Sequence, residues 1–205
     1  MRDYRRTIRL KGYDYSRDGG YFITICTSRR VHLFGEIKNQ EIKLNRPGEI
    51  VEEWWRKLKD KFSGVDLDGY TIMPNHIHGI VILSEKAPNG VGAIHELPLP
   101  KSRLQRRRML LPKIIGYFKM NSAKEINRLP DAHTTSLWQR NYYEHIIRNE
   151  NELRRIREYI QYNPLKWDLD RDNPQSRNFD MPADLYWKEI YEPAGAIHEL
   201  PLQHR

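Results

Sequence analysis

The feature that most constrains the fold is a pair of apolar runs joined only by Pro74-Asn75. The segments "VDLDGYTIMP" (65–74) and "NHIHGIVIL" (75–83) are rich in β-branched residues, and Pro-Asn is typical of a turn. We therefore predict two consecutive short strands. Along the second strand, alternation places His76 and His78 on the same face of the sheet.

The rest of the chain alternates between strand and helix patterns. Strand patterns cover 21–29 and 136–148, and a hairpin is expected within 33–45 around Asn39-Gln40. Apolar residues at helical spacing predict three helices, at 46–62, 110–129 and 149–163. This order predicts an α+β fold, with a ferredoxin-like antiparallel sheet and helices packed on one face.

The chain length suits one domain with appendages, because 205 residues exceed a typical single domain only modestly. We predict a catalytic domain over 21–168 that contains a loop insertion at 84–108. A basic N-terminal arm (1–20) precedes this domain, and a proline-rich C-terminal arm (169–205) follows it.

Charge and composition indicate the partner and the compartment. The net charge of +8 favours a polyanion, most often nucleic acid, although a merely soluble basic protein is the alternative. Cys26 is the only cysteine, which excludes an intrachain disulfide, and it is expected in the core. The chain lacks both a long apolar run and a signal-peptide core, so we expect a cytoplasmic, nucleoid-associated protein without membrane contact.

The peptide "GAIHELPL" occurs twice, at 92–99 and 195–202. Identity over a whole peptide with unrelated flanks suggests a cause at the DNA level, although two similar protein loops are the alternative. The genetic code allows this peptide to be encoded by a DNA palindrome, and sequencing the gene tests that hypothesis. We assign no chemistry to His95 or His198 within the repeats.

Two separate segments carry a candidate metal site. His76 and His78 could chelate one divalent cation, or could simply be hydrogen-bonded histidines. In "NENELRRIREYIQYNP", Tyr159 and Asn163 are four residues apart and share a helix face. The Asn163 carbonyl could supply a third ligand while Tyr159 attacks phosphorus, and such oxygen and imidazole ligands suit Mg²⁺ or Mn²⁺. Tyr159 could instead be a packing residue, and the rival tyrosines are Tyr142, Tyr143 and Tyr162.

Taken together, "MPNHIHGIVIL" and "WQRNYYEHIIRNENELRRIREYIQYNPLKW" resemble the REP-associated tyrosine transposases, a branch of the single-tyrosine, His-hydrophobe-His transposases. The N-terminal "YRR" also resembles that branch, and the match spans about residues 4 to 168. The resemblance implies metal-dependent nicking and strand transfer on single-stranded DNA beside a hairpin. The implied intermediate is a 5′-phosphotyrosine with a free 3′-hydroxyl, and no nucleoside triphosphate is needed. The third ligand position is usually glutamine in related transposases, so Asn163 departs from that pattern.

Further roles follow from the same resemblance. The nucleophile is expected at Tyr159. His145 could act near the site as a proton shuttle or as a partner of a ligand, or could instead be a packed or surface histidine. Phosphate contacts are expected from seven arginines, although a solvated surface could also explain some of them: Arg5, Arg6, Arg106, Arg107, Arg108, Arg140 and Arg148. The enzyme is expected to act as a monomer or a homodimer. The alternatives are a catalytically inactive hairpin-binding module and a ferredoxin-like RNA endonuclease.

Overall fold

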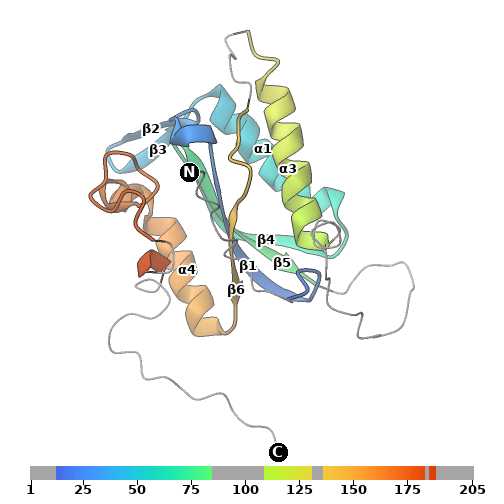
Figure 1. Cartoon of the computed structure of the whole chain (residues 1–205). Coiled ribbons are helices and arrows are strands. Elements are labelled where there is room, and N and C mark those ends of the chain that lie inside the picture. The colour runs from blue at the N-terminus through green and yellow to red at the C-terminus, as the bar shows by residue number, and fades with distance from the viewer. Residues whose placement is uncertain (1–12, 85–108, 131–135, 183–184, 188–205) are drawn as a thin grey trace, which may run out of the picture.

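The computed structural model describes residues 13–84, 109–130, 136–182 and 185–187 (Figure 1). Several predicted features lie outside these residues, namely most of the N-terminal arm, the loop insertion after Ser84, both "GAIHELPL" peptides and the end of the C-terminal arm. Five of the predicted DNA-contacting arginines lie outside them too: Arg5, Arg6, Arg106, Arg107 and Arg108.

A four-stranded antiparallel sheet forms the centre of the molecule. Its strands, in the order β4-β5-β1-β6 across the sheet, are β4 (Val65–Met73), β5 (His76–Leu83), β1 (Gly19–Cys26) and β6 (Tyr143–Ile147). Together with α1 (Arg46–Lys61) and α3 (Leu110–Ile126), the chain order is β1-α1-β4-β5-α3-β6. This βαββαβ order is the ferredoxin-like arrangement, so the predicted α+β fold is confirmed.

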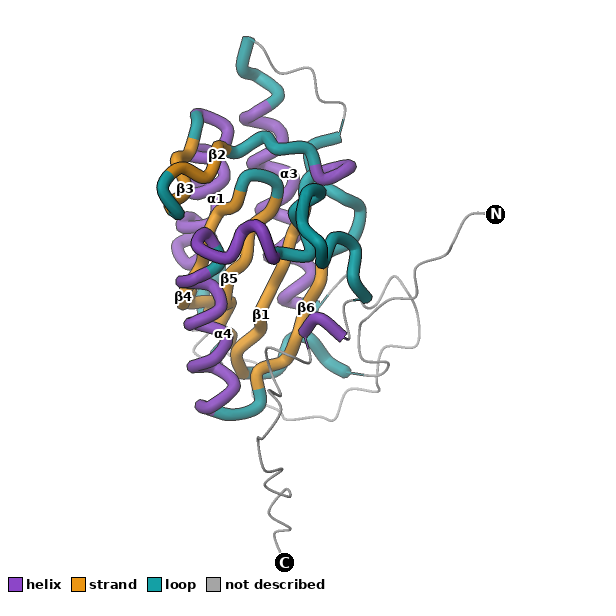
Figure 2. The backbone as a smooth tube through the Cα atoms, turned by 90° about the vertical axis from the view of Figure 1, so that its left-hand side faces the viewer, coloured by secondary structure: helices purple, strands orange, loops and turns teal. Residues whose placement is uncertain are grey.

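The helices cover both faces of the sheet. Helices α1 and α3 pack on one face, where Ile77 and Val81 of β5 join their apolar side chains in one core. Helix α4 (Glu150–Tyr162) packs on the opposite face, against Phe22 and Ile80 (Figure 2). The expectation of helices on one face therefore holds for α1 and α3, whereas α4 is an addition to the ferredoxin-like unit on the other face.

Local sequence explains the ends of the elements. Asn39 and Gln40 adopt positive φ angles of 52° and 65°, which asparagine tolerates well, and so turn β2 (Gly35–Lys38) into β3 (Glu41–Leu44). Asn45 and Asn149 cap α1 and α4, since each side chain accepts a hydrogen bond from an amide of the first turn. A 3-10 helix, η1 (Ser28–Arg30), follows β1.

The strand predicted at 136–148 is shorter in the structure. Only Tyr143–Ile147 pairs as β6, while Trp138 forms a single bridge with Thr27. The Trp138 ring turns into the core, and its indole N–H donates to Ser122 Oγ at 3.0 Å. Burial of this large side chain competes with continued strand pairing, so the first part of the segment is irregular.

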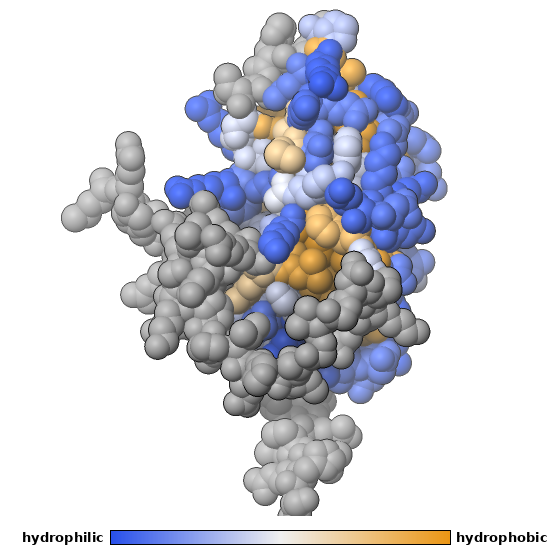
Figure 3. All heavy atoms as spheres, turned by 90° about the vertical axis from the view of Figure 1, so that its right-hand side faces the viewer, coloured by the Kyte–Doolittle hydropathy of each residue, from blue (hydrophilic) through white to orange (hydrophobic). Residues whose placement is uncertain are grey.

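The chain after α4 folds back over the sheet. Pro164 follows the last residues of α4 and begins the 3-10 helix η2 (Pro164–Leu169). Within the described residues, no helix combines the length and hydropathy needed to cross a membrane. Seen from the right-hand side of Figure 1, hydrophilic residues cover most of the described surface, with an apolar area near the middle (Figure 3).

Candidate metal and nucleophile site

Both predicted histidines lie on the face of the sheet that α4 covers. Their strand, β5, is central, and the register pairs His76 with Cys26 and His78 with Thr24 of β1. Both imidazoles are fully buried, and their Nε2 atoms are 2.9 Å apart. Two ring nitrogens therefore converge on one point between the sheet and α4.

The outer nitrogen of each ring is held by a neighbouring polar group. Asn75 Nδ2 donates to the carbonyls of Arg30 and Asp172, at 3.1 and 2.8 Å, which leaves its Oδ1 as an acceptor. This oxygen lies 2.8 Å from His76 Nδ1, so the nitrogen must donate and the lone pair of neutral His76 lies on Nε2. His78 Nδ1 lies 2.8 Å from Thr24 Oγ1. Metal-binding histidines typically have such outer partners.

The hydroxyl of Tyr159 reaches the same point from α4. Tyr159 Oη lies 3.0 Å from His78 Nε2 and donates to Asp170 Oδ2 at 3.1 Å. Its ring also packs edge-on against the His78 ring, with centroids 5.1 Å apart. Residues from β5 and α4, which are far apart in the sequence, are thus within hydrogen-bond distance.

Asp170 completes the cluster and was not predicted. It follows η2 and is buried, and its Oδ2 lies 4.0 Å from His76 Nε2 and 3.7 Å from His78 Nε2. Ligands bound about 2.1 Å from one ion are separated by roughly 3 to 4 Å. The three atoms therefore fit a shared divalent cation, and His76, His78 and Asp170 form a buried potential metal site.

Asn163, the predicted third ligand, lies at the edge of this cluster. Its side chain is buried, and Nδ2 donates to Asp170 Oδ2 at 2.7 Å. That hydrogen bond fixes the amide orientation and leaves the carbonyl Oδ1 without a hydrogen-bond partner among the described residues. Because a buried carbonyl oxygen is normally satisfied, this one is suited to a cation.

Burial and charge set the protonation states in the cluster. Burial, and then the neighbouring His78, lower the pKa of His76 well below its usual value. Burial opposes ionisation of Asp170, but the hydrogen bonds from His78 and the Asn163 amide favour its carboxylate form and hold its pKa below the usual range. Burial, and then the Asp170 charge, raise the pKa of Tyr159 well above that of an ordinary phenol. The cluster thus combines a neutral imidazole, a carboxylate and a protonated phenol.

A buried ion pair fixes the segment that carries Asp170. Arg30 Nη1 lies 2.6 Å from Asp172 Oδ1 and donates to the Arg171 carbonyl at 2.8 Å. The Asp172 amide in turn donates to Asp170 Oδ1 at 2.6 Å. Asn75 contacts the same segment through the Asp172 carbonyl, so the strand that bears His76 and the segment that bears Asp170 are directly linked.

Aromatic rings surround Tyr159. Tyr186 Oη lies 3.5 Å from Tyr159 Oη, and the Trp187 ring packs edge-on against Tyr159 with centroids 5.3 Å apart. Trp187 also stacks on Tyr143. Tyr159 therefore lies within an aromatic cluster.

The rival tyrosines lie elsewhere. Tyr142 and Tyr143 pack in the clusters on opposite faces of the sheet, and Tyr162 is exposed. His145 is on the α4 face, but its Nε2 lies 2.6 Å from Glu152 Oε1 in the first turn of α4. Among the predicted tyrosines, Tyr159 is the one hydrogen-bonded to the histidine pair.

The two predicted DNA-contacting arginines within the described residues are both exposed. Arg140 precedes β6, and Arg148 lies between β6 and α4. Their positions leave the guanidinium groups accessible to a phosphate backbone.

Asp170 gave no recognisable sequence signal. It occurs in "DLDRD", within the segment expected to form an arm, where no helical or strand period indicates which carboxylate is buried. The one available hint is a cluster of acidic residues shortly after Asn163 in a chain of net charge +8.

Sequence and structure comparisons relate the chain to bacterial proteins. An uncharacterized protein of Haemophilus influenzae is 38% identical over 168 residues, covering 82% of this chain and 92% of that protein. A second protein of that organism, provisionally named a REP-associated tyrosine transposase, is 27% identical over 192 residues and 91% of each chain. No family model matches the chain.

Two solved structures also match the chain, at lower sequence identity. One is a REP-associated tyrosine transposase bound to a REP hairpin, with a TM-score of 0.43 and 23% identity, covering 82% of this chain and 74% of that one. Another is a Deinococcus radiodurans protein provisionally described as a transposase, with a TM-score of 0.42 and 15% identity, covering 75% of this chain and 96% of that one.

Proposed function

Because the chain belongs to the REP-associated tyrosine transposases, we propose that it nicks and rejoins single-stranded DNA beside hairpin-forming repeats. The observation that carries this proposal is the position of Tyr159 Oη, 3.0 Å from His78 Nε2 and 3.1 Å from Asp170 Oδ2. A tyrosine nucleophile needs to be close to the groups that neutralise the phosphate, and this geometry provides that proximity.

The proposed cofactor is Mg²⁺ or Mn²⁺, held by His76, His78 and Asp170 with the Asn163 carbonyl as a further ligand. When bound, such an ion polarises a phosphodiester oxygen and stabilises the charge that develops there. Two neutral imidazoles and one carboxylate leave a divalent ion with a net positive charge. That charge suits an anionic phosphodiester.

The proposed reaction exchanges one phosphoester for another. Tyr159 Oη forms a bond to phosphorus, the bond to the 3′ oxygen breaks, and the products are a 5′-phosphotyrosine and a free 3′-hydroxyl. The phenol proton passes to solvent, and the departing 3′ oxygen takes a proton from solvent. No external energy source is needed, because one phosphoester bond replaces another. Asp170 accepts the hydrogen bond of the Tyr159 hydroxyl and so orients it before attack. Strand transfer reverses these steps with a second 3′-hydroxyl.

Neighbouring residues support this chemistry through position. His145 bonds Glu152, whose other carboxylate oxygen accepts from the Arg148 amide at 2.6 Å. We assign His145 to holding the start of α4 against β6, in place of proton transfer. Arg140 and Arg148, with the five arginines outside the described residues, are the proposed phosphate contacts.

The test is covalent trapping on labelled single-stranded hairpin oligonucleotides, including one that encodes the "GAIHELPL" repeat with its genomic flanks. The expected result is a denaturant-resistant adduct that requires Mg²⁺ or Mn²⁺ and disappears with EDTA, in His76→Ala and in Tyr159→Phe. Tyr162→Phe is the matched control, because Tyr162 lies on the same helix but is exposed. This variant should retain the adduct.

Each alternative predicts a different outcome. An adduct that persists in Tyr159→Phe would contradict the assigned nucleophile. Hairpin binding without an adduct on every oligonucleotide would favour an inactive binding module, and metal-independent RNA cleavage would favour an RNA endonuclease. We place the activity in the cytoplasm, on nucleoid DNA. The protein acts as a monomer or a homodimer, and light scattering distinguishes these two states.

A further inference from the structure

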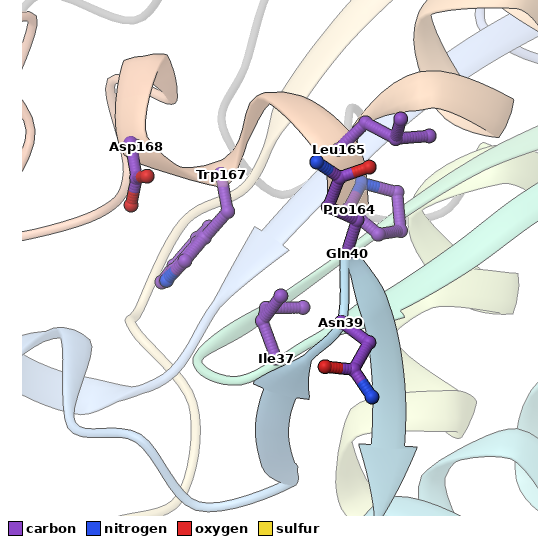
Figure 4. Close-up of a pocket in the computed structure, with 7 residues that line it drawn as sticks. All are labelled: Ile37, Asn39, Gln40, Pro164, Leu165, Trp167 and Asp168. Atoms are coloured by element: carbon purple, nitrogen blue, oxygen red, sulfur yellow. The ribbon is translucent and has the colours of Figure 1, made fainter.

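A pocket of about 270 Å³ opens beside the candidate site, between the β2–β3 turn and η2. Ile37, Asn39 and Gln40 line it from the hairpin, and Pro164, Trp167 and Asp168 line it from η2 (Figure 4). In Figure 4, the Trp167 side chain extends from η2 beside Ile37, and its ring centroid lies 5.6 Å from that of His32. The pocket is thus formed by two segments that are distant in the sequence.

The pocket lies next to the metal and nucleophile site. The Trp167 ring is 5.9 Å from the His76 ring, measured between centroids, so one aromatic side chain separates the two sites. Pro164 directly follows Asn163, whose amide bonds Asp170. A group in this pocket is therefore close enough to belong to the same DNA strand as a phosphate at Tyr159.

The chemistry of the lining selects the kind of ligand. No lysine or arginine lines the pocket, and Asp168 contributes a carboxylate, so a phosphate or another anion is disfavoured. Asn39 and Gln40 can each donate and accept hydrogen bonds, and Trp167 offers a flat aromatic face. Amides that contact base edges and rings that stack on bases are the usual means of recognising unpaired nucleotides.

Exposed apolar side chains cluster around the same part of the chain. Among the described residues, most of the exposed large apolar side chains lie in the region after α4, including Leu165 and Leu169. Leu165 also lines the pocket itself. Apolar surface beside a base pocket favours contact with unstacked nucleotides over contact with a phosphate backbone.

We propose that this pocket binds one unpaired nucleobase of the DNA strand close to the scissile phosphate, with Trp167 stacking on the base and the Asn39 and Gln40 amides contacting its edge. This inference rests on the proposed function for its ligand. The Asp168 carboxylate accepts from an exocyclic amino group, so the pocket prefers cytosine, adenine or guanine over thymine.

The test separates base binding from chemistry by using a Tyr159→Phe protein, which lacks the proposed nucleophile. Binding is measured on hairpin oligonucleotides that each carry one abasic position in the single-stranded flank. One position is expected to lose affinity on the order of tenfold when its base is removed. In a Trp167→Ala background, the same abasic position should cause little further loss.

Two variants test the lining without disturbing the metal site. Asn39→Gly combined with Gln40→Gly removes both amides, and glycine accommodates the positive φ angles of this turn. The pair should weaken binding only where the base at the critical position is present. Asp168→Asn should reduce the difference in affinity between DNA with cytosine and DNA with thymine at that position. Trp54→Ala, on the helix layer across the sheet, is the matched control and should leave the abasic pattern unchanged.

The proposed base pocket would be wrong if no abasic position lowered the affinity for DNA. It would also be wrong if the loss of affinity at each position were the same in Trp167→Ala. Trapping with the native Tyr159 protein is read separately. An adduct together with a flat scan refutes only the pocket, whereas a position-specific scan without any adduct refutes only the proposed reaction.

Discussion

Breaking the buried ion pair between Arg30 and Asp172 should strongly destabilise the segment that carries Asp170. The side chain of Arg30 is 9% exposed and that of Asp172 is 3% exposed. Arg30→Met keeps the apolar stem but leaves the Asp172 carboxylate buried, beside Asp170, without its cation. Breaking a buried pair in this way costs about 3 to 5 kcal/mol, and the Arg171 carbonyl also loses its donor.

Urea unfolding measures this free energy. The matched control is Arg46→Met, because Arg46 forms exposed ion pairs with Glu49 and Glu53 and should cost less than about 1 kcal/mol. The double variant Arg30→Met with Asp172→Asn removes the unpaired charge. It should recover at least about 1 kcal/mol relative to Arg30→Met alone, a coupling that only interacting residues show.

Equal destabilisation by Arg30→Met and Arg46→Met would refute this reasoning. So would strict additivity in the double variant, because additivity would mean that the two side chains do not stabilise one another in solution.

Three further predictions concern the sheet, α4 and the histidine pair. A Cβ at Gly79 would overlap the Trp55 indole, so Gly79→Ala should lower stability by about 1 to 3 kcal/mol in thermal unfolding. Gly116→Ala in α3 is the control, because a Cβ there meets open space, and it should be neutral or stabilising. The hydrogen bond from Arg157 lowers the pKa of Asp68, so this pair stabilises the fold above the ordinary carboxyl pKa and loses its effect as pH falls. Asp68→Asn should therefore lower the free energy of unfolding by under about 1 kcal/mol at pH 7, and this difference should disappear in acid. A difference independent of pH would contradict the pairing. Asn75→Ala should weaken Mn²⁺ binding about 10- to 100-fold in calorimetry, because it removes the hydrogen-bond partner of His76. Asn121→Ala in α3 should not weaken Mn²⁺ binding. Equal Mn²⁺ affinities of the two variants would contradict a positioning role for Asn75.

The predictable parts of this molecule are those with a periodic signal. Alternation along 75–83 places His76 and His78 on one face, and the four-residue spacing of Tyr159 and Asn163 places them together on α4. The structure brings these two pairs together because α4 packs on the histidine face of the sheet. The expected helix, hairpin and strand order is confirmed for the same reason, since each element has its own period or turn residues.

The unpredicted parts depend on irregular backbone. Asp170 follows a 3-10 helix, and Arg30 adopts a positive φ of 56° after β1, so neither side chain has a direction that sequence spacing can indicate. Their positions result from a buried network that joins residues more than a hundred positions apart. The shortened β6 has a similar origin, because the burial of Trp138 takes precedence over strand propensity.

The most direct test of the central claim is to locate the DNA attachment by mass spectrometry. Tryptic digestion of the trapped adduct should release the peptide 158–166, which contains both Tyr159 and Tyr162. Fragmentation of this peptide distinguishes the two tyrosines. We predict that the nucleotide remnant is on Tyr159, whereas attachment to Tyr162, or to any residue outside this peptide, would contradict the proposed active site.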